Sequence, residues 1–469
     1  MWHIIQNEWQ FLARSKVLWG VSGGFLLILG LAVVLGYTQR QAQAKAYTEA
    51  KEHLRQQWES IDAMNPHGAA HYGTYVFKPA SLLSSLDEGV SSITGNVLRV
   101  EGHVQNEMVH SEASQMQAVS RFGKLKSSLL LQYILPLLLI FLAFHAVSSE
   151  RQSGRLRLLV LQGARPFPII LAKTLSVWLY GLILLFLVIL VFTVLNMPRL
   201  TTEVGMRVFC FAGSYALYYF VISGLTVYFS ARWSQPSFAL TSMLGIWIVW
   251  TIFLPHILLS SVEKWHELPS RNKFKAAMKE DRAQGLDGHN PADERGVELE
   301  RETLAQYGVD SVSQLPINFD GLRMQADEEY GNQVWDKHFG KLREVMTRQK
   351  QRYQWGGLCN PFISLQNASM GFAGSDNLHH QVFLVQVEHY RRDFIKMLND
   401  KHAYGGSKTG EWGWEADNSF FKSVPDFTYE PTLLTDVLSD YAMDIFWLLA
   451  WSLVVGALLY MGASKIPLL

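Results

Sequence analysis

The sequence predicts an all-α polytopic membrane protein with six transmembrane helices and a mainly helical extracytoplasmic domain built from two insertions. The first observation is that the apolar residues, which are 49% of the 469 in the chain, are gathered into six blocks. Each block has roughly the 20 residues that a helix needs to cross a bilayer, where a helix satisfies its own backbone hydrogen bonds. The second observation is that two long polar segments interrupt the series of blocks. The predicted spans are residues 17–37, 129–147, 169–195, 206–230, 238–259 and 442–461.

The distribution of cations predicts the orientation of these spans. Lys and Arg beside transmembrane helices are retained in cytoplasmic segments. If the amino terminus is cytoplasmic, residues 148–168 and the carboxyl terminus lie on the same side, and residues 38–128 and 260–441 form the two extracytoplasmic regions. The cations near the spans that then face the cytoplasm are Arg14, Lys16, Arg151, Arg155, Arg157, Arg165, Arg232 and Lys465. We therefore expect both termini in the cytoplasm.

The first two hundred or so residues contain several predicted elements besides the spans. Residues 1–16 mix aromatic and polar side chains, as an interfacial amphipathic helix on membrane lipid does. Residues 38–61 lack Gly and Pro, so the first helix is expected to continue beyond the bilayer. Residues 65–79 contain four Gly or Pro and are expected to form a loop, and residues 113–126 a helix that returns to the membrane. The small residues at 42–44 resemble a signal-peptide cleavage site, but the apolar block before them favours an uncleaved anchor.

The second polar region is also expected to be mainly helical. Residues 293–307 and 319–353 are charged with few breakers, and residues 376–398 carry apolar side chains at spacings of four and three. That stripe predicts a packing face, made by Phe383, Val387, Tyr390, Phe394 and Leu398. Residues 404–429 are rich in Gly and aromatic residues and are expected to be irregular, with short strands.

Residues 150–168 form a basic segment between two predicted spans. A segment with four Arg cannot enter lipid, so it must lie on the aqueous surface, where a partner can reach it. Gly163 and Pro166 are expected to end its helix, and Pro168 to begin the next span. Glu150 is either in a solvated ion pair with Arg151 or orients the helix that follows. The apolar side chains offered to a partner are Leu156, Leu158, Leu159 and Leu161.

The chain carries no recognisable catalytic machinery. It has no match to the phosphate-loop pattern, and its one nucleophile-elbow pattern, residues 20–24, lies inside a predicted span. It is therefore not expected to be an enzyme by itself or to bind a cofactor directly. The formal net charge of zero gives no reason to expect nucleic acid as a partner. Cys210 and Cys359 fall in different regions and are not expected to pair.

Histidines in the two polar regions are the candidate metal ligands. His67 and His71 lie close together in the first region, and His379 and His380 are adjacent in the second. None of them stands in a known metal-binding spacing, so surface or packing roles are favoured over metal ligation. His145, near the inner end of the second span, is polar in a costly place, and a hydrogen bond between helices is the favoured explanation.

The basic segment resembles the cytoplasmic loop of ABC-2 type transporter permeases. The matching residues are Glu150, Arg151, Gly154, Leu156, Arg157, Leu158, Leu159, Gly163 and Arg165. Arg155 is a departure, since the family often has Thr there. The six spans and the cytoplasmic termini are similar as well. Residues 287–291, 315–319 and 360–370 resemble the subgroup with a large uncharacterised extracytoplasmic insertion, so the likeness covers nearly the whole chain.

The resemblance implies a permease subunit in the bacterial inner membrane. In that family the loop carries a coupling helix that docks on a separate ATP-binding subunit, which uses ATP and Mg²⁺. The implied partners are that subunit and a second permease copy or a sister permease, and the implied activity is export of a substrate. The alternative is a mechanical transmitter that acts on a periplasmic or outer-envelope protein without moving substrate. A membrane-anchored extracytoplasmic enzyme is disfavoured.

Overall fold

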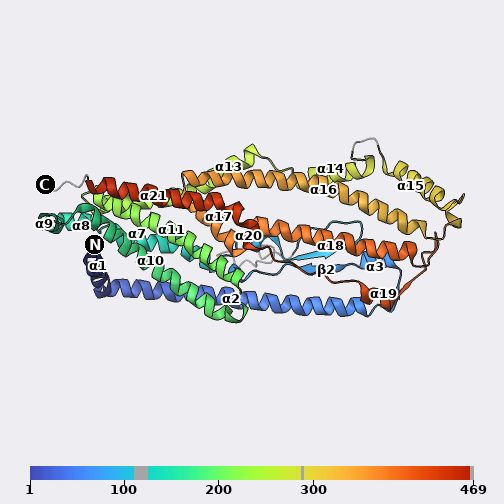
Figure 1. The fold of residues 1–469 in the computed structure, drawn as a ribbon, viewed down its shortest axis with the longest axis horizontal. Helices are drawn as coiled ribbons and strands as arrows, with labels where there is room; N and C mark the ends of the chain where they lie inside the picture. Colours follow the sequence, from blue (N-terminus) through green and yellow to red (C-terminus); the bar gives the residue numbers. More distant parts are fainter. Residues whose placement is uncertain (110–124, 287–289, 465–469) are drawn as a thin grey trace.

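The computed structural model describes residues 1–109, 125–286 and 290–464, and it shows an elongated molecule with two parts (Figure 1). Six of its helices are long and apolar enough to cross a membrane, which confirms the predicted fold class of an all-α polytopic membrane protein. Each contains one of the predicted apolar blocks. These helices are Lys16–Glu59, Ser127–Gln152, Pro166–Arg199, Thr202–Arg232, Pro236–Trp265 and Leu434–Ser464. We call them together the bundle.

The bundle is organised around α11 (Thr202–Arg232). This helix packs against α10 (Pro166–Asn196), α21 (Ala442–Ser464) and α7 (Leu135–Ala143). Three of its four tyrosines, Tyr215, Tyr218 and Tyr219, are fully buried. Gly224 lets α21 approach closely, because a Cβ there would lie 2.3 Å from a methyl group of Val455. Close packing of small and aromatic side chains thus fixes the centre of the bundle.

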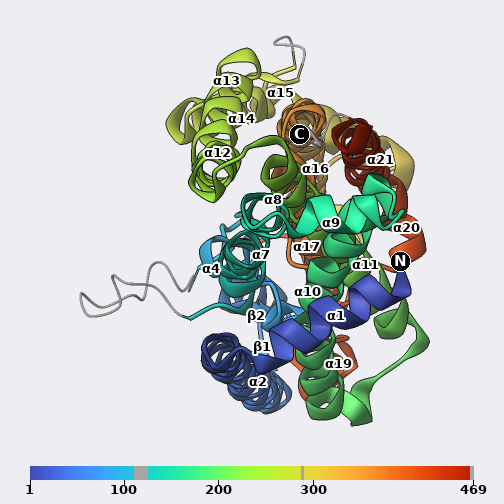
Figure 2. The same ribbon diagram turned by 90° about the vertical axis from the view of Figure 1, so that its left-hand side faces the viewer.

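One helix connects the bundle to the rest of the molecule. α2 (Lys16–Glu59) has 44 residues, begins where the Ser15 hydroxyl accepts from the Leu18 amide, and at 1.5 Å per residue is about 66 Å long. It runs from the bundle far into the second part (Figure 1), which confirms that the first helix continues beyond the predicted span, although it ends at Glu59 and not at residue 61. α1 (Trp2–Arg14) turns across the end of the bundle and packs on α10 (Figure 2).

The second part, which we call the polar domain, comprises residues 60–109 and 266–433 with the last turns of α2. The prediction of a loop at residues 65–79 was wrong. Asn65 caps α3 (Pro66–Tyr72) by accepting from the amides of His67 and Gly68, and Pro66 suits the first helical turn. The chain then enters β2 (Thr74–Phe77). The predicted helix at 113–126 lies mostly outside the described residues.

Two small antiparallel pairs join segments that are distant in the sequence. β1 (Ala63–Met64) pairs with β4 (Ala416–Asp417), and β2 pairs with β3 (Val97–Val100) in the register Thr74–Val100 to Phe77–Val97. The first pair links the two insertions. β4 also confirms the expectation of irregular sequence with a short strand after Tyr404.

The core of the polar domain confirms the predicted helical stripe. α18 (Asn377–Tyr404) buries Phe383, Val387, Phe394 and Leu398 against Trp58 of α2 and Phe421 of α19 (Asn418–Ser423), while Tyr390 is partly buried at the edge. α15 (Ala292–Tyr307) and α16 (Phe319–Gln354) also form where charged helices were expected.

Further elements complete the described fold apart from α8, α9 and α17. They are η1 (Leu82–Ser85), α4 (Ser91–Thr94), α6 (Ser127–Leu129), η3 (Leu130–Ile134), η4 (Met197–Arg199), α12 (Pro236–Ile248), η5 (Val249–Phe253), α13 (Leu254–Trp265), α14 (Arg271–Gln284), η6 (Val312–Gln314), η7 (Trp355–Leu358), α20 (Leu434–Val437) and η8 (Leu438–Tyr441).

The polar sequence also contributes a helix to the bundle. α17 (Pro361–Ala373) packs on α11 and α21, with Phe362, Leu365 and Phe372 fully buried. A buried network surrounds it, because the Ser369 hydroxyl donates to a carboxylate oxygen of Asp87 at 2.5 Å and Gln132 of η3 donates to the same carboxylate. The two parts of the molecule are therefore joined by packed side chains and not by flexible linkers alone.

Candidate functional site

The basic segment forms two short helices at one end of the bundle, the end where α1 lies (Figure 1). α8 (Ser148–Gln152) is followed by α9 (Arg155–Leu161), and a glycine stands at each end of α9. Gly154 has φ 75° and Gly163 has φ 93°. Because this left-handed region strains any residue with a Cβ, the two glycines set where α9 begins and ends.

The end of α11 anchors α8. The Ser230 hydroxyl accepts hydrogen bonds from the amides of Val147 (3.0 Å) and Ser148 (3.1 Å), which are orphan donors at the break before α8. The Arg151 guanidinium reaches the carbonyl of Ala231 and the hydroxyl of Ser234, each at 3.4 Å. Arg151 therefore contacts the bundle and is only partly exposed.

A buried lysine holds this region together. Lys173 of α10 is 2% exposed, and its Nζ lies 2.5 Å from Glu8 Oε1 of α1 and 2.9 Å from Glu150 Oε1 of α8. Glu150 thus does not form the solvated pair with Arg151 that was one of its two predicted alternatives, because the buried Lys173 needs a carboxylate partner more than the partly exposed Arg151 does. Lys173 was not predicted from the sequence, although it is the single charged residue inside the predicted span 169–195.

α9 divides its leucines between two faces. Leu156 is buried at 2% exposure and Leu159 packs partly against the bundle core, so these two are not available to a partner, contrary to expectation. Leu158 is 60% and Leu161 74% exposed. The predicted site cations Arg155, Arg157 and Arg165 are exposed as well. The outer face of α9 is therefore both apolar and basic.

His145, for which a hydrogen bond between helices was favoured, has no partner for its buried Nδ1 within the described residues.

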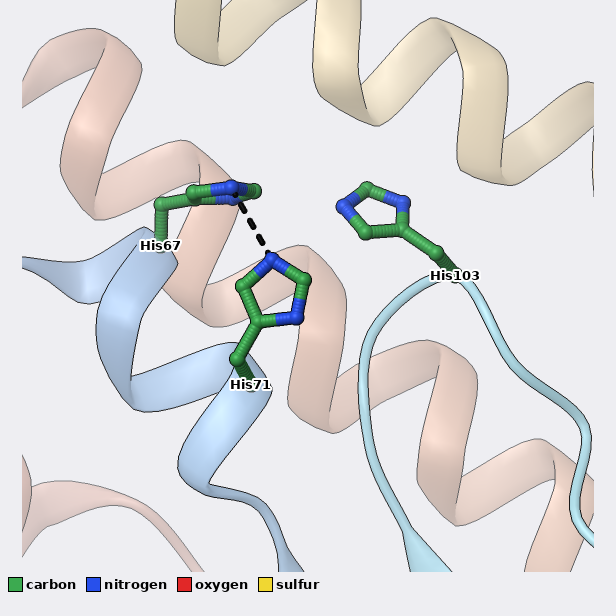
Figure 3. Close-up of side chains that lie close together, drawn as sticks. All are labelled: His67, His71 and His103. Carbon is green, nitrogen blue, oxygen red and sulfur yellow. Dashed lines mark hydrogen bonds between the residues drawn. The ribbon is translucent and has the colours of Figure 1, made fainter.

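The candidate metal ligands separate into two places. His67 and His71 lie on α3 beside His103, which follows β3 and which sequence reasoning missed (Figure 3). His379 and His380 lie elsewhere. The His379 Nδ1 is 2.7 Å from Asp376, and His380 is 3.4 Å from the Lys78 ammonium. Burial and the charge of Lys78 lower the pKa of His380 to about 4. The His379 Nε2 also lies 3.4 Å from the Arg207 guanidinium of α11, so both histidines have partners within the protein.

Comparisons with known families agree with this architecture. The family model described as ABC-2 family transporter protein matches residues 2–286, which is more than half of the chain. A second family model, described as a domain of unknown function (DUF3526), matches residues 271–430 and covers most of the second insertion. Neither a curated protein nor a solved structure matches this chain. The bundle, its six spans and the extent of the match show that the chain belongs to the ABC-2 family of transporter membrane proteins.

Proposed function

We propose that this chain is the membrane subunit of an ABC exporter and that α9 is the helix on which a separate ATP-binding subunit docks. The observation that carries the proposal is the outer face of α9, where Leu158 and Leu161 are exposed beside Arg155 and Arg157. Exposed leucines flanked by arginines are typical of a surface that inserts into an apolar groove of a partner. The ATP-binding subunit would supply ATP and Mg²⁺.

The outer face of α9 also supports an orientation of the chain in the membrane. α9 would lie in the cytoplasm with both termini, and the polar domain would lie on the opposite side of the bacterial inner membrane. The cation distribution that predicts this orientation includes Arg155 and Arg157, which the structure leaves exposed.

The anchors of α9 explain how force would pass into the bundle. Ser230 fixes α8 to α11, and Lys173 joins α8 to α10 and α1. A displacement of α9 would therefore move α1 and two helices of the bundle, α10 and α11, together. Two copies of the chain, or one copy and a sister permease, would rock between two packed arrangements as the ATP-binding subunits approach each other.

Replacement of the exposed leucines tests this proposal. The double variant Leu158→Glu with Leu161→Glu places two charges on the docking face, and we expect at least about 10-fold less ATP-binding subunit to co-purify, because a few apolar anchors supply most of the affinity of such interfaces. ATP hydrolysis stimulated by the chain should fall in parallel.

A matched control is available on the polar domain. Val297 on α15 is 69% exposed, so Val297→Glu adds a charge at an equally exposed apolar position far from α9. This variant should co-purify as the unmodified chain does. Unchanged co-purification of the double variant would overturn the proposed docking role. Replacing Glu150 and Arg151 would test the anchoring of α8 and not the docking of a partner, since both residues contact the bundle.

A second candidate function is mechanical transmission to an envelope protein. α2 and α17 link the two parts of the molecule, and the polar domain carries a groove of about 530 Å³ lined by Met346, Lys350 and Val385. Cysteine labelling separates the two candidates. ATP-dependent labelling of Ser223→Cys, buried in α11, supports export through the bundle, whereas an ATP-dependent change confined to Val385→Cys supports transmission.

A further inference from the structure

Three histidines meet in the polar domain, on the side of the molecule away from α9. His67 and His71 are four residues apart on α3 and so project from the same helix face. Their Nε2 atoms are 3.1 Å apart. His103 comes from the loop after β3, and one nitrogen from each of the three rings lies within 4.8 Å of the others. Figure 3 shows the His103 ring presenting a nitrogen toward the other two.

The separation of these atoms suits a transition metal. In a tetrahedral zinc site with Zn–N bonds of 2.0–2.1 Å, two nitrogen ligands are about 3.3 Å apart. The pair from His67 and His71 already has nearly this spacing. The third nitrogen lies within 4.8 Å of the other two, so it needs a shift of up to about 1.5 Å to complete three bonds. A ring rotation can supply that shift, since His71 is exposed and His67 and His103 are only partly buried.

A buried carboxylate orients His103. Glu328 Oε1 lies 2.8 Å from the ring Nδ1 of His103 and accepts from the His103 amide at 2.5 Å. The other oxygen of Glu328 is 3.0 Å from the Arg391 guanidinium, which keeps the carboxylate ionised. A histidine that donates one ring nitrogen to a carboxylate presents the other as a free lone pair, and metal-bound histidines are commonly held in this way.

The backbone at His103 is also held in an unusual conformation. Among the described residues His103 is the one residue other than Gly with a positive φ, 64°. Such a conformation costs of order 1 kcal/mol or more and persists only where the surroundings impose it. The two bonds to Glu328 supply that constraint, and they aim the ring at α3.

We propose that His67, His71 and His103 form a binding site for a divalent transition metal ion, with Zn²⁺ as the best-suited ion. Three imidazole nitrogens favour zinc, copper or nickel over the calcium and magnesium ions that prefer oxygen ligands. The fourth coordination position is open to solvent, because His71 is exposed and His103 lines a groove of about 710 Å³ with Asp320 and Trp412. Either water or an anionic group of a ligand in that groove completes the coordination.

The test uses the full chain in detergent or nanodiscs, stripped of metal and then titrated with Zn²⁺. We expect one Zn²⁺ per chain by elemental analysis, and an increase in the melting temperature with zinc because an ion that binds the folded state stabilises it. Co²⁺ in place of Zn²⁺ should give the visible absorption of a four-coordinate site. Mg²⁺ should leave the melting temperature unchanged.

Variants of single ligands identify the site. His71→Gln and His103→Gln should each weaken Zn²⁺ binding by about 100-fold or more, a loss at the upper end of that caused by removing the groups that orient metal ligands. His53→Gln is the matched control, because His53 is an exposed histidine on α2 outside the cluster. His71 is exposed, so its variant should fold as the unmodified chain does. Absence of stoichiometric zinc, or unchanged affinity in both ligand variants, overturns the proposal.

Discussion

The α9 end of the bundle and the polar domain are built in opposite ways. α8 and α9 themselves come from one continuous stretch of sequence, and the outer face of α9 is apolar and basic. The polar domain joins two insertions, since β1 pairs with β4 and brings Ala63 opposite Asp417, and it buries charged groups. The structure of a surface segment can be predicted from its own residues, whereas the structure of the polar domain depends on contacts between residues that are far apart in the sequence.

The central contact of the polar domain is a buried charge cluster. Arg391 of α18 is 2% exposed and bonds Glu328 of α16 at 3.0 Å and Glu388 at 2.9 Å. Both carboxylates are buried. The Lys173 cluster at the α9 end also places one buried cation between two carboxylates, but its carboxylates are about one-fifth exposed. Removing the cation is therefore expected to destabilise the polar domain more than the α9 end.

The largest effect is expected from Arg391→Met. It removes the cation that the buried carboxylates of Glu328 and Glu388 share and leaves them only His103 and the partly exposed Arg392. Breaking a buried pair by removing one partner lowers the free energy of unfolding by about 3–5 kcal/mol. Thermal unfolding of the full chain in detergent, with limited proteolysis of the polar domain, measures the loss. Arg301→Ala removes an exposed pair with Glu298 and should change the melting temperature little. If the two variants lowered the melting temperature equally, burial would not be what makes the Arg391 ion pairs important for stability.

Acid should loosen the polar domain before it affects the α9 end. Burial raises the pKa of Glu328, but bonding to His103 and Arg391 outweighs burial and lowers it from 4.5 to about 2. A depressed folded-state pKa contributes stability that is fully present above about 4.5 and is lost as the pH falls toward about 2. The shift corresponds to about 3 kcal/mol.

The measurement is the melting temperature of the full chain between pH 7 and pH 3. The unmodified chain should lose stability below about pH 4.5, the ordinary pKa of the Glu328 carboxyl. Glu328→Gln should be less stable at pH 7 and should show a smaller decrease on acidification. A pH dependence that is identical in this variant would show that other carboxylates control acid unfolding.

These differences explain what the sequence could predict. The six spans, the long α2 and the stripe on α18 were predicted because each depends on spacing within one segment. The end of α9 was predicted from Gly163 and Pro166, but the division of its leucines was not, since only the packed bundle shows that Leu156 faces inward. His103 and Lys173 were missed because their partners come from other elements, and a one-dimensional pattern does not reveal which elements meet.

The Lys173 cluster is expected to have an intermediate effect. Lys173→Met removes both bonds to Glu8 and Glu150, and the partly exposed carboxylates recover some hydration, so we expect a loss of about 2 kcal/mol in the anchoring of α8. Labelling of Leu156→Cys, buried beneath α9, by a maleimide reports this anchoring. Its rate should rise about 30-fold with Lys173→Met.

The labelling experiment needs a background in which Cys210 and Cys359 are replaced by serine. Leu158→Cys is the control, because this exposed position should label rapidly whether or not Lys173 is present. If the rate at Leu156→Cys does not depend on Lys173, the packing of Leu156 alone holds α9, and the charge cluster does not anchor it.

The smallest effect is expected from glycine replacements, and a matched pair makes it informative. Gly154 has φ 75° and Gly308, at the end of α15, has φ 64°, and a Cβ at either position would meet nothing within 4 Å. Alanine therefore costs only the strain of the left-handed conformation, about 1 kcal/mol in each case. The two variants should lower the melting temperature to a similar extent, but only Gly154→Ala changes the junction between α8 and α9.

ATP hydrolysis by the co-purified ATP-binding subunit should therefore fall with Gly154→Ala and stay unchanged with Gly308→Ala. If both variants lowered hydrolysis equally, loss of stability and not the placement of α9 would explain the effect. A glycine in the polar domain would then matter to ATP hydrolysis as much as one beside α9.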